Sequence, residues 1–241
     1  MTIRSLFDPE SSTYTYLVFD ATTRRAALID PVIERVDRDA ALVRDLGLSL
    51  ELALDTHIHA DHVTSAGALR ERTGAKTGRS AAYGPGCADL ELRGGDRLSL
   101  GETTIEVRET PGHTVGCLSF VVRDGNRIAG VMSGDALFVR GTGRTDFQGG
   151  SAATLFRSLH EQLYTLPDET IVYPGHDYQG HHTTTIGEEK RLNPRIAAGR
   201  SKEDFVRIMG NLYLAPPRKI DVAVPANVRC GRPASDDVAV G

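Results

Sequence analysis

The sequence contains no tryptophan, only three cysteines and three methionines among 241 residues, and no uninterrupted apolar stretch long enough to cross a bilayer. A membrane-spanning helix needs about 20 apolar residues, so we expect no transmembrane segment and no membrane partner. The first eight residues, MTIRSLFD, also lack the apolar core of a signal peptide. These two absences predict a cytoplasmic location.

The cysteines are few, odd in number and far apart: Cys87, Cys117 and Cys230, with no Cys-x-x-Cys pair. This usage argues against a disulfide framework and against a cysteine zinc knuckle. We expect reduced thiols in a reducing compartment. Cys117 falls in an expected strand, where cysteine is usually a small core residue, and Cys230 is expected to be exposed and inert.

A basic surplus is absent as well. Lys and Arg number 28 against 32 Asp and Glu, the formal net charge is −4, and the basic residues are spread along the chain. Nucleic-acid-binding domains usually carry a strong positive surplus, so no nucleic-acid partner is expected. A chain of this length buries roughly 70–75% of its unfolded surface. It therefore needs no structural metal to fold, and a metal site calls for a functional explanation.

The hydrophobic pattern mixes strands and helices. Strands are predicted over residues 14–19, 25–29, 50–54, 103–108, 117–122, 128–132 and 171–173. Helices are predicted over 36–46, 62–73, 154–166 and 201–212, the third with Ser151 as N-cap. The pattern indicates a β-rich sandwich covered by helices, a single domain over residues 1–231, and a polar tail at 232–241 that we expect to be disordered.

The strongest chemical signal is the segment His57-Ile58-His59-Ala60-Asp61-His62, with four metal-capable side chains in six residues. Alternate residues of an extended segment point the same way, so His57 and His59 can face one cavity. A helix starting at His62 would turn Asp61 and His62 toward the same space. A lone histidine is usually a surface or hydrogen-bonded residue, but a cluster at a strand exit is more typical of a metal site.

Three further loops repeat the plan of a strand followed by a polar ligand. They are Thr110-Pro111-Gly112-His113-Thr114, Ser133-Gly134-Asp135 and Tyr173-Pro174-Gly175-His176. Nitrogen and carboxylate donors without a thiolate suit zinc, iron or manganese. Together the four loops predict a metal pocket built from strand exits.

The order His-x-His-x-Asp-His, Pro-Gly-His, Gly-Asp and a late histidine resembles the metallo-β-lactamase superfamily. The resemblance implies an α/β fold, an αββα sandwich with the metal at the edge of its two sheets. More specific segments resemble the persulfide dioxygenases, the sulfur dioxygenases of the ethylmalonic-encephalopathy protein type, over about residues 3–231. These segments are GRTDFQ at 143–148, YPGHDY at 173–178, EEKRLNPR at 188–195, MGNL at 209–212 and VPAN at 224–227.

The resemblance implies one Fe(II) per chain, held by His57, His113 and Asp135, which would also be the catalytic centre. Two histidines and one carboxylate form the facial triad of non-haem iron oxygenases, with positions left open for O₂ and a substrate sulfur. The implied reaction oxidises glutathione persulfide with O₂ and water to sulfite and glutathione, a step of sulfur metabolism and sulfide oxidation. A homodimer is compatible with the resemblance.

Four residues are expected to bind the substrate: Arg144, Tyr178, Arg195 and Thr114. Glutathione carries two carboxylates, and arginine grips carboxylates bidentately. The alternatives are a turn-closing pair of Arg144 with Asp146, a solvated Arg195, and a hydroxyl-to-backbone bond at Thr114.

One position departs from the family pattern: Thr142 stands before Gly143, where the human-type members carry cysteine. A thiol relay at that position is excluded here. We assign no catalytic cysteine.

Two other functions stay open at this point. His59, Asp61, His62 and His176 could complete a second metal site, which would make the protein a dinuclear thioester hydrolase of the glyoxalase II type with Asp135 as the bridge. In the dioxygenase those four residues would instead orient ligands and hold water. A non-catalytic metal-binding scaffold is the third alternative, and the complete ligand set argues against it.

Overall fold

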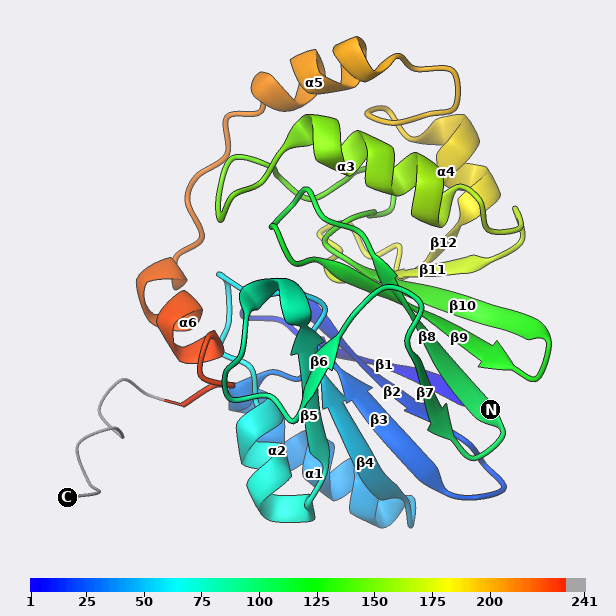
Figure 1. Ribbon diagram of the computed structural model, residues 1–241, viewed down its shortest axis with the longest axis vertical. Coiled ribbons are helices and arrows are strands. Elements are labelled where there is room, and N and C mark those ends of the chain that lie inside the picture. The colour runs from blue at the N-terminus through cyan, green and yellow to red at the C-terminus, as the bar shows by residue number, and fades with distance from the viewer. Residues whose placement is uncertain (233–241) are drawn as a thin grey trace. The chain divides into compact units, whose positions relative to one another are not determined.

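The computed structural model describes residues 1–232, and its backbone divides into two compact units (Figure 1). The first unit comprises residues 1–92 together with the described residues from 215 onward, and the second comprises residues 93–214. Each unit contains one six-stranded sheet. The tail expected at 232–241 lies, apart from its first residue, outside the described residues.

The sheet of the first unit follows the order of the chain. Its strands are β1 (Thr2–Asp8), β2 (Thr13–Phe19), β3 (Arg25–Ile29), β4 (Ser49–Leu54), β5 (Lys76–Ser80) and β6 (Leu90–Leu92). The first three strands pair antiparallel and the last four pair parallel. The helical elements are η1 (Ile33–Arg35), α1 (Val36–Asp45), α2 (Ala66–Thr73), η2 (Ala81–Tyr83) and α6 (Ile220–Asn227).

Helices α1 and α2 share a core with β2, β3 and β4 (Figure 1). The buried cluster comprises Leu17, Phe19, Ala26, Leu28, Val36, Val43, Leu50, Ala53, Ala66, Leu69 and Ala75. Each fully buried Leu, Val or Phe contributes about 1.5–3 kcal/mol relative to exposure. This core holds the parallel half of the sheet, whose strands β3 and β4 both run toward the polar loops.

The second unit builds its sheet in the reverse order, from β12 (Thr184–Thr185) and β11 (Ile171–Pro174) through β10 (Arg127–Gly134), β9 (Leu118–Asp124) and β8 (Thr103–Glu109) to β7 (Arg97–Leu100). Only β10 and β11 pair parallel. Strands β8, β10 and β11 therefore run the same way, because β9 lies antiparallel between β8 and β10. Their carboxyl ends share one sheet edge, and the loops that bear His113, Asp135 and His176 begin there.

Helices of the second unit pack on an apolar core of their own. They are α3 (Ala152–Ser158), the π-helix η3 (Leu159–Leu163), α4 (Ile186–Leu192) and α5 (Lys202–Gly210). Figure 1 shows α3 and α5 side by side, and the rings of Phe156 and Phe205 lie 5.9 Å apart between them. No helix among residues 1–232 is long and apolar enough to span a membrane.

Most predicted strands and three predicted helices are found within a few residues of their expected bounds. The Ser151 hydroxyl caps α3 as expected, accepting a hydrogen bond from the Thr154 amide at 3.3 Å. The expected strands omit β1, β5, β6, β7 and β12, and the expected helices omit α4 and α6. These omitted strands are short or carry few apolar residues, so the period-two signal is weak there.

The helix predicted over 62–73 begins only at Ala66, so the expected turn of Asp61 and His62 from a helix start is wrong. The backbone before Ala66 bonds instead to the segment that follows β3. The Ser65 amide donates to the Pro31 carbonyl at 2.8 Å, and the Ile33 amide donates to the Val63 carbonyl at 2.9 Å. These bonds hold residues 62–65 as a loop.

The prediction of reduced cysteines is wrong for two of the three. Cys87 and Cys230, 143 residues apart, form a disulfide, and Cys230 is buried and not exposed. The sequence gives no local spacing that would pair residues so far apart. Cys117 is a buried free cysteine, as expected for a core residue.

Candidate metal centre

His57 follows β4 and is oriented by a chain of hydrogen bonds that ends on Asp30. The Thr56 hydroxyl donates to Asp30 Oδ2 at 2.9 Å, and the Thr56 amide donates to Asp30 Oδ1 at 2.7 Å. His57 Nδ1 lies 2.9 Å from the same hydroxyl. Because the hydroxyl hydrogen is committed to Asp30, its lone pair accepts from Nδ1–H of His57. This arrangement favours the tautomer whose Nε2 carries a lone pair for a metal.

His59 lies beside the same carboxylate and is almost fully buried. Its Nε2 is 3.1 Å from Asp30 Oδ1 and 3.9 Å from Asp55 Oδ1. Burial works against a charged ring, but the charge and hydrogen bond of Asp30, with Asp61 and Asp55, raise the pKa of His59 to about 9. Burial raises the pKa of Asp55 to about 7, opposed by the charge of His59. The two histidines of the pattern thus differ: His57 is held by a hydroxyl and His59 by carboxylates.

Asp61 and His62 form a pair that is anchored on β2. Asp61 Oδ2 accepts from the Thr13 hydroxyl at 3.0 Å and lies 2.9 Å from His62 Nδ1. His62 is fully buried. The first unit therefore ties each polar residue of its loop to a neighbouring strand.

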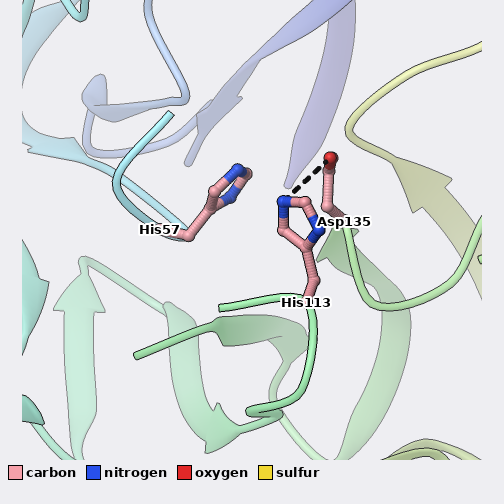
Figure 2. A group of neighbouring side chains, drawn as sticks. All are labelled: His57, His113 and Asp135. Atoms are coloured by element: carbon pink, nitrogen blue, oxygen red, sulfur yellow. Dashed lines mark ion pairs between the residues drawn. The ribbon is translucent and has the colours of Figure 1, made fainter. Parts of the chain in front are cut away.

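In the second unit, His113 and Asp135 face one another (Figure 2). His113 Nδ1 donates to the backbone carbonyl of Arg144 at 2.7 Å, which leaves Nε2 as the nitrogen with a lone pair. That Nε2 lies 3.4 Å from Asp135 Oδ2, the pair that the dashed line marks in Figure 2. On the other side, His176 Nε2 lies 3.6 Å from Asp135 Oδ1. The carboxylate thus sits between two imidazoles.

Two glycines allow the backbone to approach this carboxylate closely. A Cβ at Gly143 would lie 2.1 Å from the Asp135 carbonyl oxygen and 3.0 Å from His113 Nδ1. A Cβ at Gly175 would lie 2.6 Å from Asp135 Oδ1. Any side chain at either position would displace Asp135, which gives a physical reason for the Pro-Gly-His and Gly-Arg-Thr-Asp patterns.

The donor set and its burial fit a cation. Asp135 Oδ1 is buried and has no hydrogen-bond partner among the described residues, and a buried anionic oxygen left without a partner is costly. Three groups among residues 1–232 could each offer three ligand atoms to one ion: His57 with His113 and Asp135, His59 with Asp61 and His62, and Asp30 with Asp55 and His59. In the first of these groups, Nδ1 of each histidine donates to an uncharged oxygen, the Thr56 hydroxyl for His57 and the Arg144 carbonyl for His113. In the other two groups, the histidines lie beside carboxylates.

Arg144 and Arg195, two of the four expected substrate residues, both contact the protein itself. Arg144 forms a bidentate pair with Asp146, with both N–O distances at 2.7 Å, and its guanidinium lies 4.0 Å above the ring of Phe147. The turn-closing alternative is therefore present. Arg195 is half-buried and donates to the Thr142 carbonyl at 2.6 Å.

The other two expected substrate residues differ in accessibility. Thr114 is buried, and its hydroxyl lies 3.1 Å from Cys117 Sγ. Tyr178 is 72% exposed, and its ring stacks on His176 at 5.8 Å between centroids. Tyr178 is thus presented to solvent, whereas Thr114 supports the loop of His113.

The sequence interpretation missed three residues that hold the candidate ligands: Asp30, Thr56 and Asn227. Asp30 follows β3 as His57 follows β4, so the shared edge of parallel strands was an available signal. Thr56 stands between two recognised residues but carries no signal by itself. Asn227 lies in α6 and accepts a hydrogen bond from the Thr64 amide, which is 163 residues away in the sequence. The only sequence signal for Asn227 was the resemblance of the segment VPAN to the persulfide dioxygenases.

Comparisons with known proteins show the family to which the chain belongs. The family model of the metallo-beta-lactamase superfamily matches residues 8–176. The crystal structure of ETHE1 from Myxococcus xanthus superposes with a TM-score of 0.91 at 54% identity, covering 96% of this chain and 100% of that one. The chain belongs to the metallo-β-lactamase superfamily, and the predicted α/β fold of that superfamily is confirmed.

Within the superfamily the similarity is more specific. The human protein named persulfide dioxygenase ETHE1, mitochondrial, is 48% identical over 229 residues, covering 95% of this chain and 88% of that protein. The chain therefore belongs to the family of the persulfide dioxygenases. A more distant structure, described as TTHA1623 in a di-iron-bound form, has a TM-score of 0.65 at 32% identity and covers 80% of this chain and 99% of that one.

Proposed function

We propose that this protein is an Fe(II)-dependent persulfide dioxygenase that acts on glutathione persulfide. The observation that carries the proposal is the 48% identity to the human persulfide dioxygenase over 95% of the chain. The reaction consumes one O₂ and one water for each persulfide, GSSH + O₂ + H₂O → GSH + H₂SO₃. The terminal sulfur is oxidised to sulfite, and the inner sulfur leaves as the thiol of glutathione.

In this proposal one iron is held by His57, His113 and Asp135 (Figure 2). The hydrogen bonds at Nδ1 of both histidines support the assignment, because they leave Nε2 of each ring as the nitrogen with a lone pair. Two imidazoles and a carboxylate are the ligand set of non-haem iron oxygenases and leave positions open. When bound, the iron supplies a place where O₂ and the substrate sulfur meet and where electrons pass from sulfur to oxygen.

The surrounding residues hold the ligands in one tautomer and one direction. Asp30 acts on His57 through the Thr56 hydroxyl, and the Arg144 carbonyl acts on His113. Such partners raise the basicity of a ligating imidazole and fix its ring. The burial of His57 and Asp135 keeps bulk water from competing for their donor atoms.

The glutathione moiety would bind along Arg144 and Tyr178. The Arg144 side chain is 13% exposed and its partner Asp146 is 55% exposed, so a substrate carboxylate would bind the guanidinium by replacing Asp146. The exposed Tyr178 ring, stacked on His176, offers a flat apolar surface next to the proposed centre. Arg195 would assist from its bond to Thr142, and Thr114 would act by holding the His113 loop.

A dinuclear thioester hydrolase of the glyoxalase II type is the second candidate. The group of His59, Asp61 and His62 favours it, as does the relative that is described as di-iron-bound. The pairings of His59 Nε2 with Asp30 and of His62 Nδ1 with Asp61 engage one ring nitrogen of each histidine, and His59 Nδ1 is buried without a hydrogen-bond partner among the described residues. These pairings would not prevent a second metal, so the preference for the dioxygenase rests on the 48% identity to the human persulfide dioxygenase.

Metal analysis of protein purified without oxygen, combined with an oxygen electrode, tests the proposal. We expect one iron per chain and O₂ uptake with glutathione persulfide that matches sulfite release one to one. Two metals per chain, with thioester cleavage and no O₂ uptake, would replace this function with the hydrolytic one.

Asp135→Ala should lose iron and O₂ uptake together, because it removes the anionic ligand of the proposed centre. Metal content and O₂ uptake are measured on the same preparation. Asp168→Ala is the matched control, since this carboxylate is exposed and pairs only with Lys190 among the described residues. Iron retained at the wild-type level in Asp135→Ala would contradict the ligand assignment.

A further inference from the structure

Asn227, the last residue of α6, directs its whole side-chain amide at the loop of the His-x-His-x-Asp-His pattern. It is 2% exposed. Its Nδ2 donates to the carbonyls of His59 at 2.9 Å and His62 at 2.8 Å, and its Oδ1 accepts from the Thr64 amide at 2.8 Å. Three backbone groups of one short loop therefore depend on one side chain that arrives from the far end of the sequence.

The residues after Asn227 also lie against this loop, backbone to backbone. The Gly67 amide donates to the Cys230 carbonyl at 3.1 Å, and a Cβ at Gly67 would lie 2.5 Å from that oxygen. A Cβ at Gly231 would lie 2.0 Å from the Thr64 carbonyl oxygen. Cys230 itself adopts a left-handed conformation with φ of 55°. A non-glycine residue stays in that conformation only where its surroundings hold it.

A second support reaches the loop from the segment after β5. The Ile58 amide donates to the Tyr83 hydroxyl at 3.2 Å. Tyr83 ends η2, and Cys87 follows four residues later in the chain. The disulfide between Cys87 and Cys230 therefore ties together the two segments that contact the loop.

We propose that Asn227 and the Cys87–Cys230 disulfide form a redox-sensitive clamp that positions the metal-binding loop 57–62. Asn227 is a positioning residue in this proposal, because it acts through the loop backbone and touches no ligand atom of His57. Reduction of the disulfide loosens the clamp and weakens retention of the metal. The identity of the metal rests on the proposed function, whereas the structural order of the loop 57–62 does not depend on it.

The reduction needs two molecules of a low-molecular-weight thiol. The first, as thiolate, attacks the half-buried Cys87 sulfur, and the buried Cys230 sulfur leaves as a thiolate that takes up a proton. The second thiol displaces the first from Cys87. Two protein thiols and one small disulfide result, with two electrons and two protons transferred. Glutathione, the product of the proposed reaction, belongs to this class of reductant.

The effect should reach the metal through the geometry of the ligands. Partners that orient a ligating histidine typically change metal affinity about 10- to 100-fold when they are removed. Without the disulfide, the left-handed turn at Cys230 loses its covalent restraint and keeps only backbone hydrogen bonds, such as that from the Gly67 amide, and Asn227 lies three residues away. The clamp then holds the His59 and His62 carbonyls less firmly.

The clamp can be tested by two measurements, neither of which requires a persulfide substrate. The first is hydrogen exchange of the amides of residues 58–67 in the metal-free protein, and the second is the rate at which a chelator removes the bound metal. The oxidised wild type is compared with the thiol-reduced wild type, Cys87→Ser, Asn227→Ala and Asn227→Asp. Val222→Ala is the matched control in α6, since Val222 is exposed and lies outside these contacts.

We expect Asn227→Ala and the reduced wild type to release the metal about 10-fold faster or more, with faster exchange confined to the loop. Asn227→Asp keeps the acceptor for Thr64 but turns a carboxylate oxygen toward the buried His59 and His62 carbonyls, so it should release the metal at least as fast as Asn227→Ala. Cys87→Ser should match the reduced wild type and stop responding to thiol. Val222→Ala should behave as the oxidised wild type.

Equal loop exchange and equal metal release before and after reduction would overturn the proposal. So would finding Cys87 and Cys230 as free thiols in protein purified without a reductant. Val43→Ala, which truncates a buried core residue of α1, separates the clamp from a general loss of stability, and a matching profile in that variant would also refute the proposal. A protein without O₂ uptake that still shows the expected exchange would refute the dioxygenase and leave the clamp standing.

Discussion

At the candidate centre, the placement of His57 and of His113 is fixed by a hydrogen bond at the Nδ1 atom of each ring. His57 gives its Nδ1 to the Thr56 hydroxyl and His113 gives its Nδ1 to a backbone carbonyl. Each imidazole is thereby restricted to one tautomer and one ring direction. The chemistry of the site therefore depends on residues, such as Asp30 and Thr56, that lie outside the proposed ligand set of His57, His113 and Asp135.

Thr56→Val should weaken iron binding about 10- to 100-fold, because it keeps the size of the side chain and removes the hydroxyl between Asp30 and His57. The measurement is the dissociation constant for Fe(II) under anaerobic conditions. Thr73→Val, at the end of α2, is the control for loss of a threonine hydroxyl away from the site. An unchanged dissociation constant for Thr56→Val would show that His57 needs no such partner.

Arg144→Ala should raise the KM for glutathione persulfide about 10-fold, the scale of about 1.4 kcal/mol for a lost charge-assisted contact. Iron content should stay the same, because His113 bonds to the backbone carbonyl of residue 144 and not to its side chain. Steady-state kinetics and metal analysis check both points. The exposed Arg157→Ala serves as the control, and a KM equal to wild type in Arg144→Ala would exclude the carboxylate grip.

At the scale of elements, the ends of parallel strands gather the polar residues. Asp30 follows β3 and His57 follows β4, and these two strands are parallel neighbours. In the other unit, Asp135 follows β10 and the loop of His176 follows β11, again parallel neighbours. The carboxyl ends of parallel strands are where ligands bind in open sheets, so strand direction explains why the ligands recur at strand exits.

The turn between β1 and β2 offers a test of stability against pH. Asp8 is buried, and despite that burial the hydroxyl and amide of Ser11 and the guanidinium of Arg35 lower its pKa to about 2. A carboxyl with a lowered folded-state pKa stabilises the protein above its unfolded pKa of about 3.9. That contribution is lost as the pH falls from about 4 to about 2.

Asp8→Asn should therefore lower the free energy of unfolding by roughly 2 kcal/mol at pH 7, and the difference from wild type should vanish toward pH 2. Urea unfolding of the metal-free protein across this range measures it. The control is Asp45→Asn, since among residues 1–232 the exposed Asp45 carboxylate pairs only with the exposed Arg44. A difference that does not depend on pH would show that Asp8 acts by packing and not by charge.

The local hydrophobic pattern predicted the strands well where apolar and polar residues alternate. It failed where hydrogen bonds from a segment distant in sequence hold a loop. Strands over residues 103–108 and 128–132 and the capped helix after Ser151 were predictable, because their signals lie within the segment. The start of α2 was not, because bonds from residues 31–33 to 63–65 keep the preceding turn out of the helix. Local periodicity carries no information about such a partner.

At the scale of the whole molecule, the disulfide joins a cysteine that precedes the second unit in the sequence to a cysteine that follows it. Cys87 precedes that unit and Cys230 follows it, 143 residues later. A cross-link over a loop of this length restricts the unfolded chain strongly. The bond thus acts on the stability of the chain as well as on the loop beside it.

Reduction of the disulfide should lower the free energy of unfolding by about 2–5 kcal/mol. Urea unfolding of the metal-free protein with and without a thiol reductant measures the change, and the midpoint should fall. Cys87→Ser is the control, because it cannot form the bond and should not respond to the reductant. A midpoint that stays constant on reduction of the wild type would contradict a stabilising role for this bond.

The sequence by itself determined the chemical class of the site, since residue type decides which atoms can bind a metal, and the strand-to-ligand order identified the superfamily. The tertiary structure alone decided which ring nitrogen is available, that Asp30 lies behind His57, that Cys87 meets Cys230, and that Asn227 holds the loop. These pairs lie 26 or more residues apart in sequence. Their contacts follow from how the strands and helices pack, which no local pattern of residues records.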